Sequence, residues 1–227
     1  SEATMNKIIR GRNANNKKVK TLFIAQVVLG VMPVLLLILF VWKKMYQTPI
    51  VGTVFIILIF LCNLAYAFLA RWYAVLHSGV KGERRLFRTV KKLHGTNIVF
   101  HNLPVRYKRG RSELDMLIVC HAGVLIIEVK NHSGTISGSW RDDKWTQRDG
   151  KVTETMMDNP IKQMRRQRDI VKSILTAAGE NVWIDSVLYF SSPNAKLKIS
   201  LRESDYVCCE SAELLEFLKS YDSGETL

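Results

Sequence analysis

Cysteine is scarce in this sequence, and its cysteines are not spaced for a shared structural role. Among 227 residues there are four, at Cys62, Cys120, Cys208 and Cys209, and no two of them form a CxxC pair. Adjacent cysteines such as Cys208 and Cys209 seldom bridge each other, and Cys62 lies in a long apolar run. Because this pattern offers no disulfide framework, we expect the protein to work in a reducing compartment.

Several ligand-binding signatures are also missing. The sequence contains neither GxxxxGKS/T nor GxGxxG, so the chain is not expected to be an ATP-driven motor. Its five histidines show no HxxxH spacing and no paired cysteines, which argues against a zinc site. No internal repeat or low-complexity tract is present. The function must therefore be sought in other patterns of charge and hydropathy.

Charge is absent from two long stretches. Thr21 to Trp42 spans 22 residues and Ile50 to Ala70 spans 21, and neither stretch contains a charged residue. Each matches the roughly 20 residues that a helix needs to cross about 30 Å of hydrocarbon. The first stretch is too long for a cleaved signal peptide and is followed by the second. We therefore expect a hairpin of two transmembrane helices at about residues 21–42 and 50–70.

Basic residues flank these stretches unequally. The segment 1–20 contains six of them (Lys7, Arg10, Arg12, Lys17, Lys18 and Lys20), whereas the connection between the stretches contains only Lys43 and Lys44. More basic residues follow from Arg71 onward. By the positive-inside rule, both termini and the domain 71–227 are expected on the cytoplasmic side of the cell membrane, with the protein multi-pass. Small residues in the spans leave self-association, or assembly into a protein complex, open.

The net charge of +13 is unevenly distributed. Residues 1–70 carry +7, residues 71–172 carry +11 and residues 173–227 carry −5. The first value is explained by topology, but the second extends far beyond the membrane boundary. A basic face of this kind suits a polyanion, with nucleic acid as the commonest partner and anionic lipid headgroups as the alternative.

The pattern of residues 71–227 predicts a mixed α/β domain. The expected elements are an amphipathic helix at 80–94, a strand from 97, a basic loop at 104–111, a hairpin of 114–120 and 124–130, short strands between 135 and 154, a helix at 159–177, strands at 183–191, 196–201 and 206–209, and a helix at 211–221.

The hairpin brings acidic residues together. If Cys120 pairs with Gly123 across the turn, Asp115 falls opposite Glu128. Glu128 and Lys130 then share one face, because side chains alternate along a strand. Two carboxylates and an ammonium would thus meet on a hairpin that is otherwise apolar.

Carboxylates at the end of an apolar sheet need compensation. Mg²⁺ or Mn²⁺ would provide it through Asp115, Glu128 and the Val129 carbonyl, since such ions prefer oxygen ligands and take few carboxylates. Lys130 could then orient an attacking water or stabilise charge on a phosphodiester. The alternative is a solvated aspartate beside an ordinary Glu/Lys edge pattern, because an ExK triplet alone is common.

The wider pattern is far more specific than the triplet. It comprises Gly82-Glu83, Glu113-Leu114-Asp115, Gly123 to Asn131 (GVLIIEVKN), Gly134 to Gly138 (GTISG), Trp145, and Asn159 to Gln163 (NPIKQ). In this order, over about residues 79–190, the chain resembles the nuclease-related domain called NERD, a branch of the PD-(D/E)xK nuclease-like superfamily. Leu114 stands where the superfamily often has proline.

This resemblance implies a central mixed sheet flanked by helices, and a metal-dependent nuclease site. Matched by position, Glu83 is the helix-borne acid and Asp115 the metal-binding aspartate, and Glu83, Asp115 and Glu128 would hold the metal. Glu128 and Lys130 form the ExK pair, and Gln163 is the polar helix residue near the site. Many relatives in the superfamily have lost cleavage and act as binding modules.

Basic side chains near these residues suggest a path for nucleic acid, DNA rather than RNA. The expected phosphate contacts are Lys108, Arg109, Arg111, Lys162, Arg165 and Arg166. A solvated face is the alternative for the helix residues, and Trp140 and Trp145 could stack on bases or pack in the core. Of the histidines, only His132 is expected near the site, and its role is left open.

The leading hypothesis from the sequence is a membrane-tethered nuclease-like protein that hydrolyses phosphodiesters with Mg²⁺ or Mn²⁺. The first alternative is a catalytically inactive membrane-tethered protein that binds nucleic acid or scaffolds a complex with the same fold. The second alternative is a domain whose basic face only contacts lipid.

Overall fold

The computed structural model describes residues 7–11, 14–44, 47–93, 97–108, 110–150 and 154–223. The chain forms two compact units, one of residues 13–80 and one of residues 1–12 with 81–227. Arg109, predicted to contact nucleic acid, and His94 lie outside the described residues.

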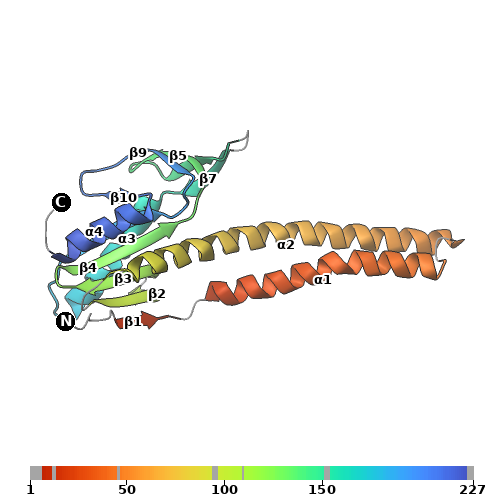
Figure 1. Cartoon of the computed structure of the whole chain (residues 1–227), viewed down its shortest axis with the longest axis horizontal. Helices are drawn as coiled ribbons and strands as arrows, with labels where there is room; N and C mark the ends of the chain where they lie inside the picture. The colour runs from red at the N-terminus through yellow and green to blue at the C-terminus, as the bar shows by residue number, and fades with distance from the viewer. Residues whose placement is uncertain are drawn as a thin grey trace. The chain divides into compact units, whose positions relative to one another are not determined.

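Helices and strands alternate irregularly along the chain (Figure 1). In order they are β1 (Lys7–Arg10), α1 (Ala14–Trp42), α2 (Pro49–Val90), β2 (Ile98–Tyr107), β3 (Gly110–Cys120), β4 (Gly123–Lys130), β5 (Gly134–Ser139), β6 (Lys144–Arg148), β7 (Glu154–Asp158), α3 (Pro160–Ala177), β8 (Ile184–Phe190), β9 (Ala195–Ser200), β10 (Tyr206–Cys208) and α4 (Ser211–Ser223).

The unit of residues 13–80 is an antiparallel pair of apolar helices. The ring of Phe23 lies 6.0 Å from that of Tyr73, and the ring of Phe40 lies 5.8 Å from that of Phe55. The contacts run in opposite chain order in α1 and α2, so the helices are antiparallel. Both helices are long and apolar enough to cross a membrane, and their most apolar windows are not buried by other parts of the structure.

Two expectations about the element boundaries are wrong. The helices expected at 50–70 and 80–94 are parts of one continuous helix, α2, because no proline interrupts residues 71–79. The basic loop expected at 104–111 is mostly strand, since Pro104 pairs with Glu113 and Tyr107 pairs with Gly110.

The main sheet has six strands in the order β1-β2-β3-β4-β8-β10, and it is mixed, as predicted. Strands β2, β3 and β4 are antiparallel, whereas β4, β8 and β10 are parallel to one another. The predicted hairpin register is confirmed from Cys120↔Gly123 to Met116↔Ile127. Gly123 has φ +139°, and an added Cβ there would collide with the Trp183 carbonyl, so glycine is required in this turn.

Strand β1 is an addition that the sequence pattern did not reveal. Residues Lys7 to Arg10 pair in parallel with β2 at the edge of the main sheet. The basic segment 1–20 therefore contributes a strand to the α/β unit, besides its expected role beside the first apolar helix.

Helices cover both faces of the main sheet. The end of α2 and helix α4 pack on one face, in a cluster that includes Leu86, Ile127 and Leu214. Helix α3 covers the other face through Ile170, which packs in a cluster with Ile126. Because Ile126 and Ile127 are neighbours in β4, their side chains point to opposite faces. The unit is therefore an α/β/α sandwich.

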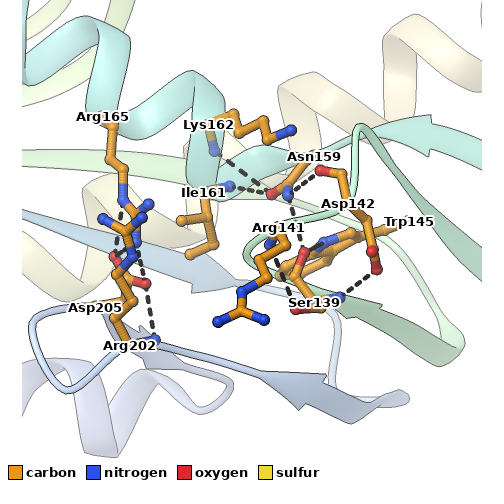
Figure 2. A network of polar contacts seen from close by, with 10 residues as sticks. All are labelled: Ser139, Arg141, Asp142, Trp145, Asn159, Ile161, Lys162, Arg165, Arg202 and Asp205. Atoms are coloured by element: carbon orange, nitrogen blue, oxygen red, sulfur yellow. Dashed lines mark hydrogen bonds and ion pairs between the residues drawn. The ribbon is translucent and has the colours of Figure 1, made fainter.

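A second sheet, ordered β7-β6-β5-β9, holds the start of α3. Trp145 of β6 is fully buried in a cluster with Ile161 and Met164 of α3. The side chain of Asn159 caps α3, since its Oδ1 accepts hydrogen bonds from the backbone of Ile161 (2.9 Å) and Lys162 (3.4 Å) (Figure 2). These contacts fix the position and rotation of α3, which carries several site residues.

The packing of Trp145 yields a stability prediction. A Cβ added at Gly138 would overlap the indole ring of Trp145, whereas one at Gly110 would meet Ile170 at ordinary contact distance. Gly138→Ala should lower the free energy of unfolding by about 1–3 kcal/mol, because the core cannot accommodate the extra group. Gly110→Ala should change it by less than about 0.5 kcal/mol. Unfolding of both variants in detergent checks this, and equal stability would contradict the packing.

Candidate functional site

The site lies where the β3–β4 ladder ends. The backbone pairing stops at Met116↔Ile127, so Asp115 does not continue it opposite Glu128 as the register alone predicts. Instead, the Asp115 carboxylate accepts a hydrogen bond from the Val129 backbone N–H at 2.8 Å. The acid thus takes the place of a ladder hydrogen bond and lies beside the strand that carries Glu128 and Lys130.

Glu128 is the centre of a polar network. Its side chain is only 3% exposed, and its Oε1 accepts from the Lys130 ammonium and from the Gln163 amide, both at 2.7 Å. Lys130 also donates to the Gln163 Oε1 at 2.9 Å. The structure therefore brings together Glu128, Lys130 and Gln163, three of the residues predicted from the sequence.

Gln167 completes this network and was not predicted as a site residue. It is fully buried, and its Nε2 donates to Glu128 Oε2 at 2.7 Å and to the Glu113 carbonyl at 3.2 Å. These two bonds settle which amide atom is the nitrogen. The signal that could have revealed it is spacing, because Gln163 and Gln167 lie one helical turn apart on the same face of α3.

Glu83, the predicted helix-borne acid, is buried near the end of α2. Its Oε2 accepts a hydrogen bond from Asn102 at 3.3 Å. Asn102 itself is buried and has φ +54°, an uncommon backbone conformation for a residue other than glycine. No sequence pattern indicated Asn102, because its role depends on α2 lying against β2.

Asp115 lies in an environment that disfavours its charge. Burial is the largest cause that raises its pKa above the ordinary value, and the nearby negative charge of Glu128 raises it further. The Val129 amide and the Lys130 ammonium lower the pKa, but they do not cancel these effects. Glu83 is also close enough to raise it. A bound proton or a cation would relieve the cost of burying Asp115 beside Glu128.

The residues present fit Mg²⁺ or Mn²⁺ in their chemistry. Asp115 and Glu128 offer hard oxygen ligands, and Gln167 Oε1 is buried without a hydrogen-bond partner among the described residues, as expected of a group that accepts from a water molecule. Within the described ranges, no three His, Cys, Asp or Glu side chains are grouped to hold a metal. A cation here would rest on Asp115, Glu128, the predicted Val129 carbonyl and water. The predicted ligand Glu83 accepts a hydrogen bond from Asn102.

His132 follows the strand that carries the network. Its Nδ1 lies 2.8 Å from Gln147 Oε1, and Gln147 Nε2 donates to the Ser133 carbonyl. The Gln147 amide oxygen therefore faces the ring, so the Nδ1 of His132 is the donor. The Nε2 of His132 then carries the lone pair when the ring is neutral. Burial lowers the pKa of His132, and Lys130 lowers it further. The ring is therefore mainly neutral at pH 7.

The predicted phosphate contacts fall into two groups. Lys108, Lys162, Arg165 and Arg166 line one open pocket of about 540 Å³ between α3 and the β2–β3 turn. Arg111 lies outside this pocket, exposed on β3 directly opposite the exposed Arg106. Such a like-charge pair is unfavourable unless an anion compensates it.

Two of the pocket cations already have partners. Lys162 forms an ion pair with Asp143 at 2.6 Å, and the bond lowers the pKa of that carboxyl. Arg165 binds the buried Asp205 through both carboxylate oxygens, at 2.5 and 2.7 Å from its Nη2 (Figure 2). Lys108 and Arg166 are exposed and have no ion pair among the described residues.

The two tryptophans that could stack on bases differ. Trp145 is a core residue whose indole N–H donates to the Ser139 carbonyl at 2.9 Å, so it is not available to a ligand. Trp140 is partly exposed and is surrounded by arginines. The core interpretation is thus correct for Trp145.

Comparisons with known proteins show which family the chain belongs to. An uncharacterised protein of Bacillus anthracis is 34% identical over 71 residues, which cover 30% of this chain and 34% of the relative. The chain thus spans about a third of the length of this curated relative. No solved structure matches the chain. The family model of the nuclease-related domain matches residues 78–191, half of the chain, and this match includes every member of the Glu128 network. The chain therefore belongs to the nuclease-related domain (NERD) family.

Proposed function

We propose that the protein is a membrane-anchored nuclease of the PD-(D/E)xK type. It binds nucleic acid, DNA in preference to RNA, and hydrolyses phosphodiester bonds with Mg²⁺ or Mn²⁺ at the cytoplasmic face of the cell membrane. The single observation that carries this proposal is the network in which Lys130, Gln163 and Gln167 all bind the buried Glu128 beside Asp115.

Helix α3 links this network to a basic surface. Its inward residues Gln163 and Gln167 hold Glu128, while Lys162 and Arg166 line the open pocket on the outer side. Since an α-helix with its side chains is about 10–12 Å across, a phosphate backbone bound in the pocket would pass within roughly one helix diameter of the site. This arrangement supports a phosphodiester as the substrate.

Each side chain has a distinct part in the proposed reaction. A bound Mg²⁺ or Mn²⁺ would supply positive charge against the phosphate and lower the pKa of water. The Lys130 ammonium would stabilise the developing negative charge by its own charge and by hydrogen bonds, and Gln163 holds the ammonium in place. Gln167 fixes the orientation of Glu128 and offers Oε1 to a water molecule.

The membrane part of the proposal rests on α1 and the first half of α2. Both helices have the length and apolar character of spans, and the charge-free stretches end near basic residues. The excess of basic residues before the first stretch and after the second favours the cytoplasm for the α/β unit.

One observation favours a second candidate function. Both oxygens of Glu128 already accept hydrogen bonds from side chains of the chain itself. A self-sufficient network of this kind also suits a catalytically inactive, membrane-tethered protein that binds nucleic acid or scaffolds a complex. That function predicts salt-sensitive binding without metal dependence and without a cleaved product.

Substitution of the site residues tests catalysis. Asp115→Ala and Lys130→Ala should each reduce Mn²⁺-dependent cleavage of DNA by at least about 100-fold, because each removes a group aligned with the reacting phosphate. The measurement is a gel-based nuclease assay of the full chain in detergent. Glu216→Ala and Lys219→Ala, exposed on α4, are the matched controls and should retain activity. Equal activity in all five proteins would refute the assignment.

Gln167 provides a separate test of the network. Gln167→Ala should weaken Mn²⁺ binding and cleavage by about 10–100-fold, because the orientation of Glu128 and the acceptor for water are both lost. Mn²⁺ titration by electron paramagnetic resonance measures the affinity without reference to activity. Circular dichroism verifies that the variant is folded. Unchanged Mn²⁺ affinity in a folded variant would show that Gln167 has only a packing role.

The raised pKa of Asp115 predicts a pH effect on stability. Above the ordinary aspartate pKa of about 3.9, Asp115 is deprotonated in the unfolded chain, whereas the folded protein favours its protonated form. The free energy of unfolding therefore falls as the pH rises. In chelator, Asp115→Asn should therefore melt at a higher temperature than the wild type at pH 7, with a smaller difference at pH 4. Thermal unfolding across this range checks it, and a lower melting temperature at pH 7 would contradict the electrostatic account.

A further inference from the structure

Three guanidinium groups surround the indole of Trp140. The guanidinium carbon of Arg202 lies 3.7 Å from the ring centroid, that of Arg141 lies at 4.9 Å, and that of Arg165 lies at 5.6 Å. Figure 2 shows Arg141, Arg165 and Arg202 on neighbouring segments. Contacts of this kind attract a cation to the face of an aromatic ring.

The three arginines differ in how their charge is balanced. Arg165 is largely buried and is neutralised by Asp205. Arg141 and Arg202 are exposed, and within the described ranges neither forms an ion pair. Among the neighbouring acids, Asp142 accepts from the Ser139 backbone, Asp143 pairs with Lys162, and Glu203 is exposed. Two exposed guanidinium groups without an ion pair among the described residues therefore lie against Trp140.

Both arginines are held on ordered loops. In the β5–β6 turn, the Arg141 N–H donates to Ser139 Oγ at 3.3 Å. In the β9–β10 loop, the Arg202 N–H donates to Asp205 Oδ2 at 3.1 Å. The Trp140 N–H donates to the Ser200 carbonyl at 2.9 Å and joins the two loops. The backbones of both loops are thus fixed by hydrogen bonds, and the guanidinium groups lie against one ring, which reduces the entropy lost on binding.

The β5–β6 turn, which carries Arg141, is also hydrogen-bonded to α3, the helix that carries Gln163. The Asn159 side-chain amide donates to the carbonyls of Ser139 (3.0 Å) and Asp142 (2.7 Å), while its oxygen caps α3 (Figure 2). Gln163 follows four residues later, so its contact with Glu128 lies about one turn along α3 from this cap.

We propose that Trp140, Arg141 and Arg202 form a binding platform for the phosphate backbone of nucleic acid, in addition to the pocket lined by Lys108 and Arg166. The inference rests on the proposed nucleic-acid function and extends it to Arg141 and Arg202, which no sequence pattern indicated. A guanidinium that stacks on a ring keeps its N–H edge available for bidentate contact with a phosphate. The predicted contacts Lys162 and Arg165 are already paired with acids, whereas Arg141 and Arg202 are exposed and form no ion pair among the described residues.

Binding of DNA in chelator tests the platform separately from catalysis. The full chain in zwitterionic nanodiscs is titrated into a fluorescent DNA oligonucleotide, and anisotropy is measured at several salt concentrations. The Arg141→Gln/Arg202→Gln protein should bind at least about 10-fold more weakly, with a salt slope lower by about two, because two phosphate contacts are lost. Lys172→Gln/Lys219→Gln removes the same charge from exposed positions elsewhere and should bind within about 2-fold of the wild type.

A second variant guards against misfolding. Arg141→Lys/Arg202→Lys keeps the charge but loses the planar groups, so it should bind more weakly than the wild type while the salt slope stays the same. If both arginine variants bind the DNA oligonucleotide as tightly as the control variant does, the proposed platform is wrong. Loss of binding to anionic vesicles with unchanged DNA affinity would assign the surface to lipid and overturn it too. DNA binding that depends on Arg141 and Arg202 without any cleavage would uphold the platform while the catalytic proposal fails.

Discussion

The rest of the site depends on how the chain holds the buried carboxylate of Glu128. A carboxylate with so little exposure is costly unless charge and hydrogen bonds compensate it. Lys130 supplies the charge, and Gln163 and Gln167 supply two further donors. Because both glutamines come from α3, the strand and the helix must keep one relative position. The capped start of α3 and the buried Trp145 secure that position, so the second sheet serves as a support for the site.

Helix α2 contributes to the same arrangement from the opposite face of the main sheet. A Cβ added at Gly82 would crowd Asn131 and Ser191, so only glycine allows this close approach. Three residues further on, the Arg85 guanidinium donates to the Asn131 side chain and to the Ser191 carbonyl. These contacts clamp the helix to the ends of β4 and β8 and place Glu83 near Asp115. The acids therefore approach each other through packing that is independent of any ligand.

The sequence predicted the parts of this site that local rules govern. The hairpin register follows from a glycine turn, so Asp115 and Glu128 could be placed near each other in advance, and the start of α3 follows from Asn159 and Pro160. Gln163 was placed near the two acids only by the resemblance to the NERD family. The pairing of Lys162 with Asp143 and of Arg165 with Asp205 could not, because these partners lie far apart in the chain. Asn102 was missed for the same reason, and β1 because four residues at a sheet edge carry too little pattern. Gln167 was missed although its spacing of one helical turn from Gln163 could be seen in the sequence.

The central claim is that Asp115 and Glu128 share a divalent cation. The most direct measurement is X-ray anomalous scattering from crystals of the full chain soaked with Mn²⁺. The account predicts an anomalous peak between the two carboxylates, at about 2.0–2.2 Å from an oxygen of each, the distance range of a Mg²⁺-like ion. Absence of a peak there at millimolar Mn²⁺, with Glu128 still bound by Lys130, Gln163 and Gln167, would contradict it and would favour the inactive binding protein.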